Sequence, residues 1–430
     1  MLHLLVALGT LTELDPFSFD DFTWQSGNAR THDSPLATKY VTGEFRLDDA
    51  FNYSFNHPKD DTIGGSTEAW RSGENQITQL GIGGDFHVDN AIGRLMTQFG
   101  MLSATTPRND ASPARGQWDL AGAYRYISEG YGGYHFGDPH RGVNVEAGLF
   151  MSYVGLWSYY NFDNWTYQPS YVSSNTPWFF NGARVQWFPT DRLKIEPWLI
   201  NGWQSYGKFN SLPGIGGQVR YAPTGSVILI ANQYFLGADI LGVPDRHRLH
   251  TDDSIQVKWY EDKHAFISRV ATTFTFDFGC EYGGGAACST SRTNGVLFVG
   301  FMAYVRAWAG EHVAATFGGG AIDNPGRYLV LLPPINGATA ASGTPYFTEN
   351  PGDVFQAWDT QLTLDYMPSQ FVTFRAEFVY RHANVPYFSG AGGITPTGGN
   401  QGALGSQVAG WTPDLVKDEP RFSLSLLVKL

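Results

Sequence analysis

The chain has 430 residues, of which 42% are hydrophobic and only 16% carry a charge, well below the quarter that is typical of soluble domains. Its formal net charge is −12, which argues against nucleic acid as a partner. No stretch approaches the roughly 18 consecutive apolar residues that a transmembrane helix needs, so a membrane assignment has to rest on strands.

The chain begins with a segment, 1–39, that precedes the first predicted strand. Its first ten residues, MLHLLVALGT, resemble the end of a secretory signal's apolar core but lack the basic stretch that normally comes first. We interpret them either as a truncated signal peptide or as the native start. The rest of the segment, including Trp24–Pro35, is expected to lie in the periplasm or to tuck inside the strands as a partial plug.

From about residue 40 onward, stretches of alternating apolar and polar residues are separated by turns and loops. In the clearest stretch, the apolar set is Val372, Phe374, Ala376, Phe378 and Tyr380, and the polar set is Thr373, Arg375, Glu377 and Arg381. Such alternation is typical of a strand with one face in lipid and the other in water, and closed outer-membrane barrels are built from such strands.

The alternating stretches are rich in Val, Ile, Phe, Tyr and Thr, which favours strands over helices. The predicted strands are 43–56, 77–89, 91–101, 128–137, 143–152, 178–188, 192–203, 215–222, 225–236, 253–261, 263–278, 295–308, 311–320, 356–367, 371–382 and 420–430. They number about sixteen, an even number as single-chain bacterial barrels require. The last one ends in Leu430, where such barrels commonly end in an aromatic residue.

Short and long connections alternate along the chain. The short ones contain VDNA, FPTDR, APTGS, YEDKH, WAGEH and MPSQ, and the long ones cover roughly 57–76, 102–127, 153–177, 204–214, 237–252, 279–294, 321–355 and 383–419. This asymmetry is typical of barrels with short periplasmic turns and long extracellular loops. A solenoid or propeller would show a repeat of about 20–50 residues, and we find none. Residues 40–430 are therefore predicted to form an all-β, transmembrane antiparallel barrel.

The aromatic content of 15% suits the girdles that such barrels place at the two membrane interfaces. One loop, Ser152–Trp178, is unusually aromatic and lies between the fifth and sixth strands, where general porins fold a loop inward. We predict that it constricts the pore, and its candidate rings are Tyr153, Trp157, Tyr159, Tyr160, Trp165 and Tyr167. These rings either stack on passing sugars or cations or pack the loop onto the barrel wall.

The face opposite the apolar one is expected to line the channel. The predicted pore-lining residues are Arg46, Arg94, Arg184, Lys194, Glu196, Arg220, Lys258, Arg269, Arg306, Asp359, Arg375, Glu377 and Arg381. Because both signs of charge are present with a slight basic excess, the lumen would favour anions weakly. Alternatively, many of these charges pair across neighbouring strands and hold the wall rigid.

Two further features concern the loops. Cys280 and Cys288 are the only cysteines, and we predict a loop disulfide rather than a metal pair, since no histidine lies nearby. The apolar patch Tyr328–Pro334 is expected to fold against the barrel mouth or into the lumen.

Sequence motifs for catalysis or cofactor binding are not evident. RHRLHTDD, with His247 and His250, could bind a divalent ion, but we expect a solvated loop there. No nucleophile-elbow, phosphate-loop or zinc-protease pattern occurs, so no catalytic residue, cofactor or metal is predicted. An outer-membrane hydrolase stays a third alternative, because Ser and His could meet on adjacent strands.

Several stretches resemble the outer-membrane β-barrel porin family described as OmpL-like. They are DSPLATKY, SFNHPKDDTIGGSTE, LMTQFGM, TTPRNDASPARGQW, AYRYISEGYGGYHF, MSYVGLWSYYNFDNW, YQPSYVSSNTPWFFNG, KIEPWLINGWQSYG and NPGRYLVLLPPINGATAASGTPYFTENPGD. The resemblance spans nearly the whole chain. It implies a porin-like barrel in the outer membrane of a Gram-negative bacterium, without assigning a solute or a functional residue.

Together these features predict a porin for the passive diffusion of small hydrophilic solutes. Its expected partners are outer-membrane lipid and lipopolysaccharide, small polar solutes or ions, and further copies of itself in a homotrimer. The alternative function is a non-transporting barrel that acts as an adhesin or structural anchor.

Overall fold

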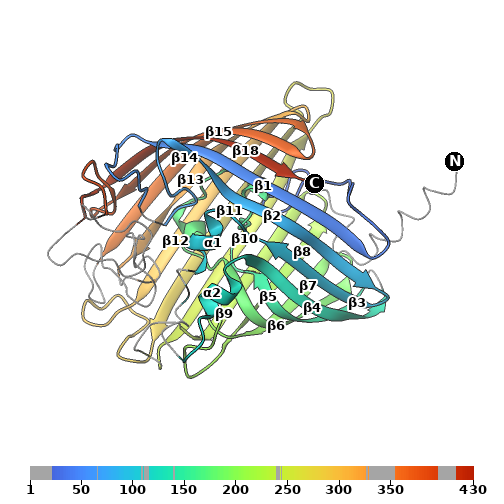
Figure 1. The fold of residues 1–430 in the computed structure, drawn as a ribbon, viewed down its shortest axis with the longest axis horizontal. Coiled ribbons are helices and arrows are strands. Elements are labelled where there is room, and N and C mark those ends of the chain that lie inside the picture. Colours follow the sequence, from blue (N-terminus) through green and yellow to red (C-terminus); the bar gives the residue numbers. More distant parts are fainter. Residues whose placement is uncertain are drawn as a thin grey trace.

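Sixteen strands close into one antiparallel barrel (Figure 1). This computed structural model describes residues 22–64, 66–107, 110, 116–138, 141–238, 243, 245–325, 328, 354–395 and 413–430. Each strand pairs with its neighbours in the chain, and the pairing of β1 with β18 closes the ring. The predicted fold class, a closed barrel of about sixteen strands, is confirmed.

The barrel strands follow the chain in order. They are β1 (Val41–Ser54), β2 (Glu74–Val88), β3 (Ala91–Thr97), β4 (Ile127–Asp138), β5 (Arg141–Met151), β6 (Phe179–Thr190), β7 (Leu193–Ile200), β8 (Gly214–Thr224), β9 (Val227–Gly237), β10 (His247–Glu261), β11 (Arg269–Tyr282), β12 (Leu297–Ala309), β13 (Val313–Asn324), β14 (Phe355–Ser369), β15 (Val372–Ala383) and β18 (Asp418–Lys429). The last long loop contains a separate small sheet of β16 (Phe388–Ser389) and β17 (Leu415–Val416).

Helical structure is confined to the loops. The short helices are α1 (Leu102–Thr105), α2 (Leu120–Tyr124) and α3 (Tyr171–Ser174), with a 3₁₀ turn at Asn161–Asp163. Within the described part of the chain, none of these helices is long and apolar enough to cross a bilayer.

The alternation of residue types fixes the two faces of the wall. On β14, the outward side chains Trp358, Leu362 and Leu364 are about half exposed, whereas the inward Thr363 and Asp365 are almost fully buried. Successive side chains of a strand point to opposite faces, so apolar residues cover the outside and polar residues face the lumen. This is the arrangement that a barrel in lipid requires.

Short and long connections lie at opposite ends of the barrel. Only two residues join β2 to β3, β6 to β7, β8 to β9 and β14 to β15, while the connections at the other end are longer. Below, the two ends are called the short-turn end and the long-loop end. Both Val41, where the barrel begins, and Lys429 lie at the short-turn end.

Two sequence predictions about β10 and β11 are wrong. RHRLHTDD is not a solvated loop, because β10 already begins at His247, and His250 is buried on its inward face. There its Nδ1 lies 2.7 Å from the Tyr328 hydroxyl, and its Nε2 lies 2.7 Å from the Asp277 carboxylate. The stretch 263–268, predicted as the start of a strand, is instead part of the turn before β11. Polar residues hid the start of β10, whereas the apolar run Ala265–Ile267 made the turn before β11 resemble a strand.

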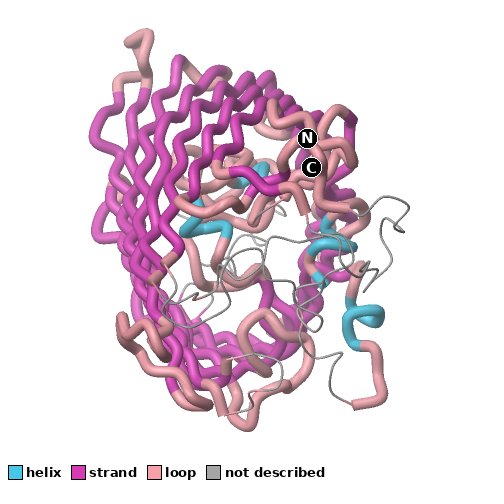
Figure 2. Tube along the Cα trace, turned by 90° about the vertical axis from the view of Figure 1, so that its left-hand side faces the viewer, coloured by secondary structure: helices cyan, strands magenta, loops and turns pink. Residues whose placement is uncertain are grey.

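Several connections fold into the barrel rather than away from it. In Figure 2, which is turned by 90° from Figure 1, the strands surround loops and short helices. Tyr328 of the seventh long loop is fully buried against His250 and Phe298. The rest of the predicted patch Tyr328–Pro334, like residues 1–21 with their predicted signal remnant, lies outside the described residues.

Candidate functional site

The lumen is the candidate site, and its wall carries rows of paired charges. On the β1–β4 side, the Arg94 guanidinium reaches Glu44 at 3.0 Å, Asp85 at 3.0 Å and Glu129 at 2.9 Å. Arg46 pairs with the same Glu44. Arg94 on β3 thereby links β1, β2 and β4, which fits the alternative that charges pair across the wall, whereas Arg46 and Glu44 both lie on β1.

The same pattern continues around the barrel. Arg184 on β6 pairs with Glu146 on β5, and Lys194 on β7 lies 2.5 Å from Glu196. On the opposite side, Arg306 and Arg375 both reach the Asp365 carboxylate at 2.7 Å. Removing one member of such a buried pair leaves an uncompensated charge, which is costly at this depth.

Wall charges also hold the aromatic loop 152–178, called the inner loop from here on. The backbone N–H groups of Tyr167 and Gln168 donate to the Glu377 carboxylate at 2.6 and 2.7 Å. The N–H of Tyr171 donates to Asp359 at 2.9 Å. Two carboxylates of the wall therefore serve as acceptors for buried backbone N–H groups of the loop, which need a hydrogen-bond partner.

Arginines of the wall bind the carbonyl groups of the same loop. Arg375 donates to the carbonyls of Asn161 at 3.1 Å and Asn164 at 2.7 Å, while Arg306 donates to that of Trp165 at 3.1 Å. The inner loop thus leaves the wall between β5 and β6 and docks on β12, β14 and β15. It crosses the lumen, where the sequence predicted a constriction.

The rings of the inner loop are packing elements. Trp157 stacks edge-on against Tyr304 at 4.8 Å, and Trp165 does the same against Trp308 at 5.7 Å. Tyr153 packs on Phe180 and Trp198, both at 5.1 Å. These three loop rings are at most 7% exposed, so packing covers most of their surface, and Tyr153 and Trp157 reach the cavity described below with the remainder.

The remaining predicted rings are held by their hydroxyl groups. Tyr160 donates to Glu129 at 2.8 Å and lies under the Arg46 guanidinium. Tyr167 contacts the Thr78 hydroxyl at 2.8 Å, and Tyr159, the least buried of the set, donates to Gln98 at 2.6 Å. Burial raises the pKa of all three tyrosines well above its usual value, so their hydroxyl groups keep their protons.

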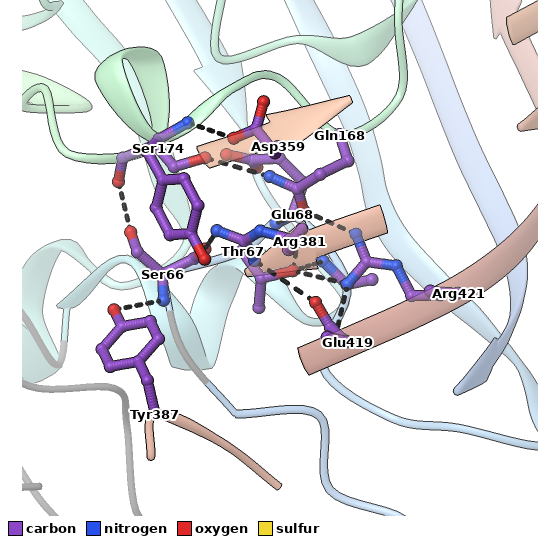
Figure 3. Close-up of polar contacts among 12 residues, drawn as sticks. Ser66, Thr67, Glu68, Gln168, Ser174, Asp359, Arg381, Tyr387, Glu419 and Arg421 are labelled. Carbon is purple, nitrogen blue, oxygen red and sulfur yellow. Dashed lines mark hydrogen bonds and ion pairs between the residues drawn. The ribbon is translucent and has the colours of Figure 1, made fainter. Parts of the chain in front are cut away.

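The first long loop, 55–73, also enters the lumen from the long-loop end. Figure 3 shows the network in which Arg381 donates to the Ser66 carbonyl at 2.7 Å and Arg421 donates to the Thr67 hydroxyl at 3.0 Å. Gln168 of the inner loop accepts from both Thr67 and Arg421. The two loops and the wall therefore form one connected polar network.

Glu68 lies in this network close to both arginines. Burial, with a further contribution from the nearby Asp48, raises the pKa of Glu68 to about 8, although Arg381 and Arg421 act in the opposite direction. At neutral pH most molecules therefore carry an uncharged Glu68 carboxyl group.

The described part of the N-terminal segment, 22–40, enters the lumen from the short-turn end. Trp24 is fully buried, and its carbonyl accepts a hydrogen bond from the Trp165 indole at 3.1 Å. Gln25 accepts from Arg220 at 2.9 Å, and the backbone of Ser26 donates to Gln256 at 2.8 Å. Residues 24–26 therefore lie in the lumen, which is one of the two positions, periplasmic or lumenal, predicted for this segment.

Two further predicted pore-lining residues, Lys258 and Arg269, contact the same N-terminal segment. The Lys258 ammonium lies 5.8 Å from the centre of the Trp24 ring, and Arg269 donates to the Thr23 hydroxyl. The predicted pore-lining residues lie at inward positions of their strands, and most of them contact a lumenal segment or another wall charge. Their role in lining a pore stays a prediction.

A cavity of about 280 Å³ remains beside the inner loop. Its lining includes Lys194 and Arg220 near the short-turn end of β7 and β8, and Met151 and Trp178 at the long-loop end of β5 and β6. The cavity therefore extends along the β6–β9 wall, on the side that the inner loop leaves open.

Some lining residues escaped the sequence prediction. Gln186 and Gln218 line the cavity from inward positions that follow from the alternation of β6 and β8. The alternation of β18 likewise gives the inward position of Arg421, which belongs to the network with Thr67 and Gln168 and not to the cavity lining. Glu68 had no such signal, because a loop residue has no alternating neighbours to orient it.

The two cysteines that were predicted to pair form a disulfide at the long-loop end. Cys280, the third residue from the end of β11, forms a disulfide with Cys288, and the bridge closes a loop between positions eight residues apart. Such a bridge is compatible with an oxidising compartment.

Comparison with solved structures finds barrels of the same fold. The outer membrane channel DcaP of Acinetobacter baumannii is 11% identical, with a TM-score of 0.50, over 91% of this chain and 97% of that one. An anion-selective porin from Comamonas acidovorans is 10% identical, also with a TM-score of 0.50, over 91% and 99% of the two chains. No individually curated protein matches the sequence.

Comparison with family models identifies the chain's relatives. The model described as "Putative beta-barrel porin-2, OmpL-like" matches residues 46–410, which is most of the barrel. The resemblance seen in the sequence is thereby confirmed, and so is the outer membrane as the location. The protein belongs to the OmpL-like beta-barrel porin-2 family of outer-membrane porins.

Proposed function

We propose that this porin is a channel for the passive diffusion of small hydrophilic solutes, with a weak preference for anions. The observation that carries the proposal is the cavity along the β6–β9 wall, which has lining residues from both ends of the barrel. Space beside the inner loop that is lined by polar groups on its barrel side supports the diffusion of a hydrated solute.

The charges along this path support the anion preference. Lys194 and Arg220 line the cavity, and Glu68, the one acidic residue among the described residues of its lining, has a pKa raised to about 8. At neutral pH the lining is therefore more basic than acidic. The preference is weak because Lys194 also pairs with Glu196, which compensates part of its charge.

Planar-bilayer recording of the refolded full chain tests the proposal. We expect stepwise conductance in potassium chloride, and a reversal potential in a salt gradient that indicates a modest excess of chloride permeation. A barrel that inserts but conducts no current would overturn the channel function, while a clear cation preference would overturn only the selectivity.

One observation favours a second candidate, a non-transporting barrel. The inner loop, the first loop and the N-terminal segment all occupy the lumen, and rings such as Trp24, Trp157 and Trp165 belong to one buried cluster with the wall. A barrel filled in this way could serve as an anchor for its outer loops. The same recording separates the two functions, because an anchor would carry no current.

Assembly into a homotrimer stays a prediction from the sequence. Measurement of the mass of the detergent complex, corrected for bound detergent, would distinguish a trimer from a monomer.

A further inference from the structure

The cavity has two chemically different sides. The barrel side presents amide and cationic groups from β6, β7 and β8, and these are Gln186, Lys194, Gln218 and Arg220. The facing side belongs to the inner loop and is mainly apolar, with Tyr153, Val154, Leu156, Trp157 and Pro169. A solute that fits both sides has a hydrogen-bond-accepting, negatively charged end and an apolar body.

The two cations of the barrel side are direct neighbours. Lys194 and Arg220 are opposite each other in the register of β7 and β8, an arrangement in which like charges repel. Lys194 is also bonded to Glu196, and Arg220 to Gln25. Arg220 can add a carboxylate to the partners that it already has, because a guanidinium carries five N–H donors in a fork and can serve several acceptors.

The apolar side is held in place by packing. Trp157 is fixed by Tyr304 and Trp165, and Tyr153 by Phe180, Trp198 and a hydrogen bond from its hydroxyl to the Gln233 carbonyl at 2.6 Å. Such a rigid surface selects by shape at little cost in side-chain entropy. The volume of about 280 Å³ lies just below the range of drug-sized pockets, so it suits one small organic molecule.

We propose that this cavity is a binding subsite for small carboxylates with an apolar or aromatic body, which would make them favoured solutes of the channel. The inference rests on the proposed diffusion function and adds the class of solute. Glu68 is compatible with it, because an acid whose pKa is about 8 is largely neutral at physiological pH and does not repel a carboxylate.

The test uses single channels of the full chain and four probe molecules. Benzoate has both the ring and the charge, benzyl alcohol has the ring alone, acetate has the charge with almost no body, and benzylamine has the ring with the opposite charge. We expect benzoate to interrupt the potassium chloride current at concentrations about tenfold lower than any of the other three, since each lacks one of the two contacts.

Two variants assign the effect to the cavity. Arg220→Gln and Lys194→Gln should each raise the half-blocking benzoate concentration about tenfold, as expected for the loss of one charge-assisted hydrogen bond. Lys263→Gln is the matched control, because Lys263 is exposed in the turn before β11 and should leave the block unchanged. Circular dichroism and heat-shifted migration on gels would verify that each variant has folded.

Binding in detergent gives a readout that does not require current. Quenching of tryptophan fluorescence by benzoate should saturate in the parent protein and weaken about tenfold in Arg220→Gln. Potassium chloride current with equal block by all four probes would overturn the inference and leave the diffusion function standing. Stronger block by benzylamine would also overturn it. Absence of current in any salt would overturn the diffusion function and this inference together.

Discussion

At the scale of single residues, the lumen shows charged side chains acting as anchors. Arg375 is almost fully buried, pairs with Asp365, and binds two carbonyls of the inner loop. One guanidinium therefore connects β15, β14 and a loop more than 200 positions away in the sequence. Its five donors make it better suited to this task than lysine would be.

Replacement of this anchor should cost stability and loosen the loop. Arg375→Met leaves Asp365 with Arg306 as its remaining cation and deprives two loop carbonyls of their donor. We expect the free energy of unfolding to fall by about 3 kcal/mol and the current noise to increase. Urea titration in detergent measures the first effect. The matched control Arg292→Met, at an exposed position, should change stability by less than about 0.5 kcal/mol.

Glu68 should make ion selectivity depend on pH. Because its pKa is raised to about 8, the carboxyl group is neutral below that value and becomes negative as the pH rises through it. We expect the anion preference to decline between about pH 7 and about pH 9, as measured by the reversal potential. Glu68→Gln should keep the preference constant over this interval. A pH dependence that survives in the variant would assign the effect to another group.

At the scale of elements, the inner loop is constrained from two directions. Its anchors on β12, β14 and β15 hold it across the lumen, and the Trp165 indole bonds to the N-terminal segment at Trp24. The N-terminal segment thus supports the inner loop from the short-turn end. Both elements are expected to set the width of the channel.

Shortening either element should raise conductance. Replacing Ser152–Trp178 by a short Gly-Ser linker removes the obstruction itself, so we expect the larger increase in single-channel current. Deleting residues up to Arg30 removes only the support at the short-turn end, and a smaller increase with more frequent current fluctuations is expected. An unchanged current in the loop variant would show that the loop does not constrict the pore.

At the scale of the whole molecule, closure of the sheet makes a lipid-exposed wall possible. All sixteen strands are paired on both sides, so no edge leaves backbone groups unsatisfied in the hydrocarbon region. The outward residues provide the apolar band, and the inward residues build a polar interior that several loops partly fill.

A charge placed on the outer face should destabilise the barrel if that face lies in lipid. Leu362 lies at the middle of β14 and is about half exposed on the outside. Leu362→Arg should destabilise the barrel in lipid vesicles by about 2–4 kcal/mol, whereas Leu362→Ala should cost less. Reversible urea unfolding in vesicles measures both. Equal stability of the two variants would contradict the placement of this face in lipid.

Much of the barrel could be predicted because the information is local. A period of two within one strand shows which of its faces is apolar, and this was sufficient to place Arg375, Glu377 and Arg381 inside. Turn residues such as those of MPSQ marked where strands end. The prediction was wrong at His247–Asp252, where polar residues on both faces hid the first half of β10.

The contents of the lumen could not be predicted in the same way. The inner loop was recognised from its length, its rings and its position, but nothing in the sequence pairs Tyr167 with Glu377 or Trp165 with Trp24. Such contacts join positions that are distant in the chain, and a loop has no periodicity to orient its side chains.

The amino-acid sequence by itself determined the number of strands, the apolar and polar faces of each, and the two unlike ends of the barrel, because these follow from hydrogen bonding and burial between neighbours in the chain. Only the tertiary structure decided that wall charges bind loops, that Trp24 lies inside, and that a cavity extends along β6–β9. Those outcomes depend on which groups meet when the sheet closes, and closure brings together residues that share no local pattern.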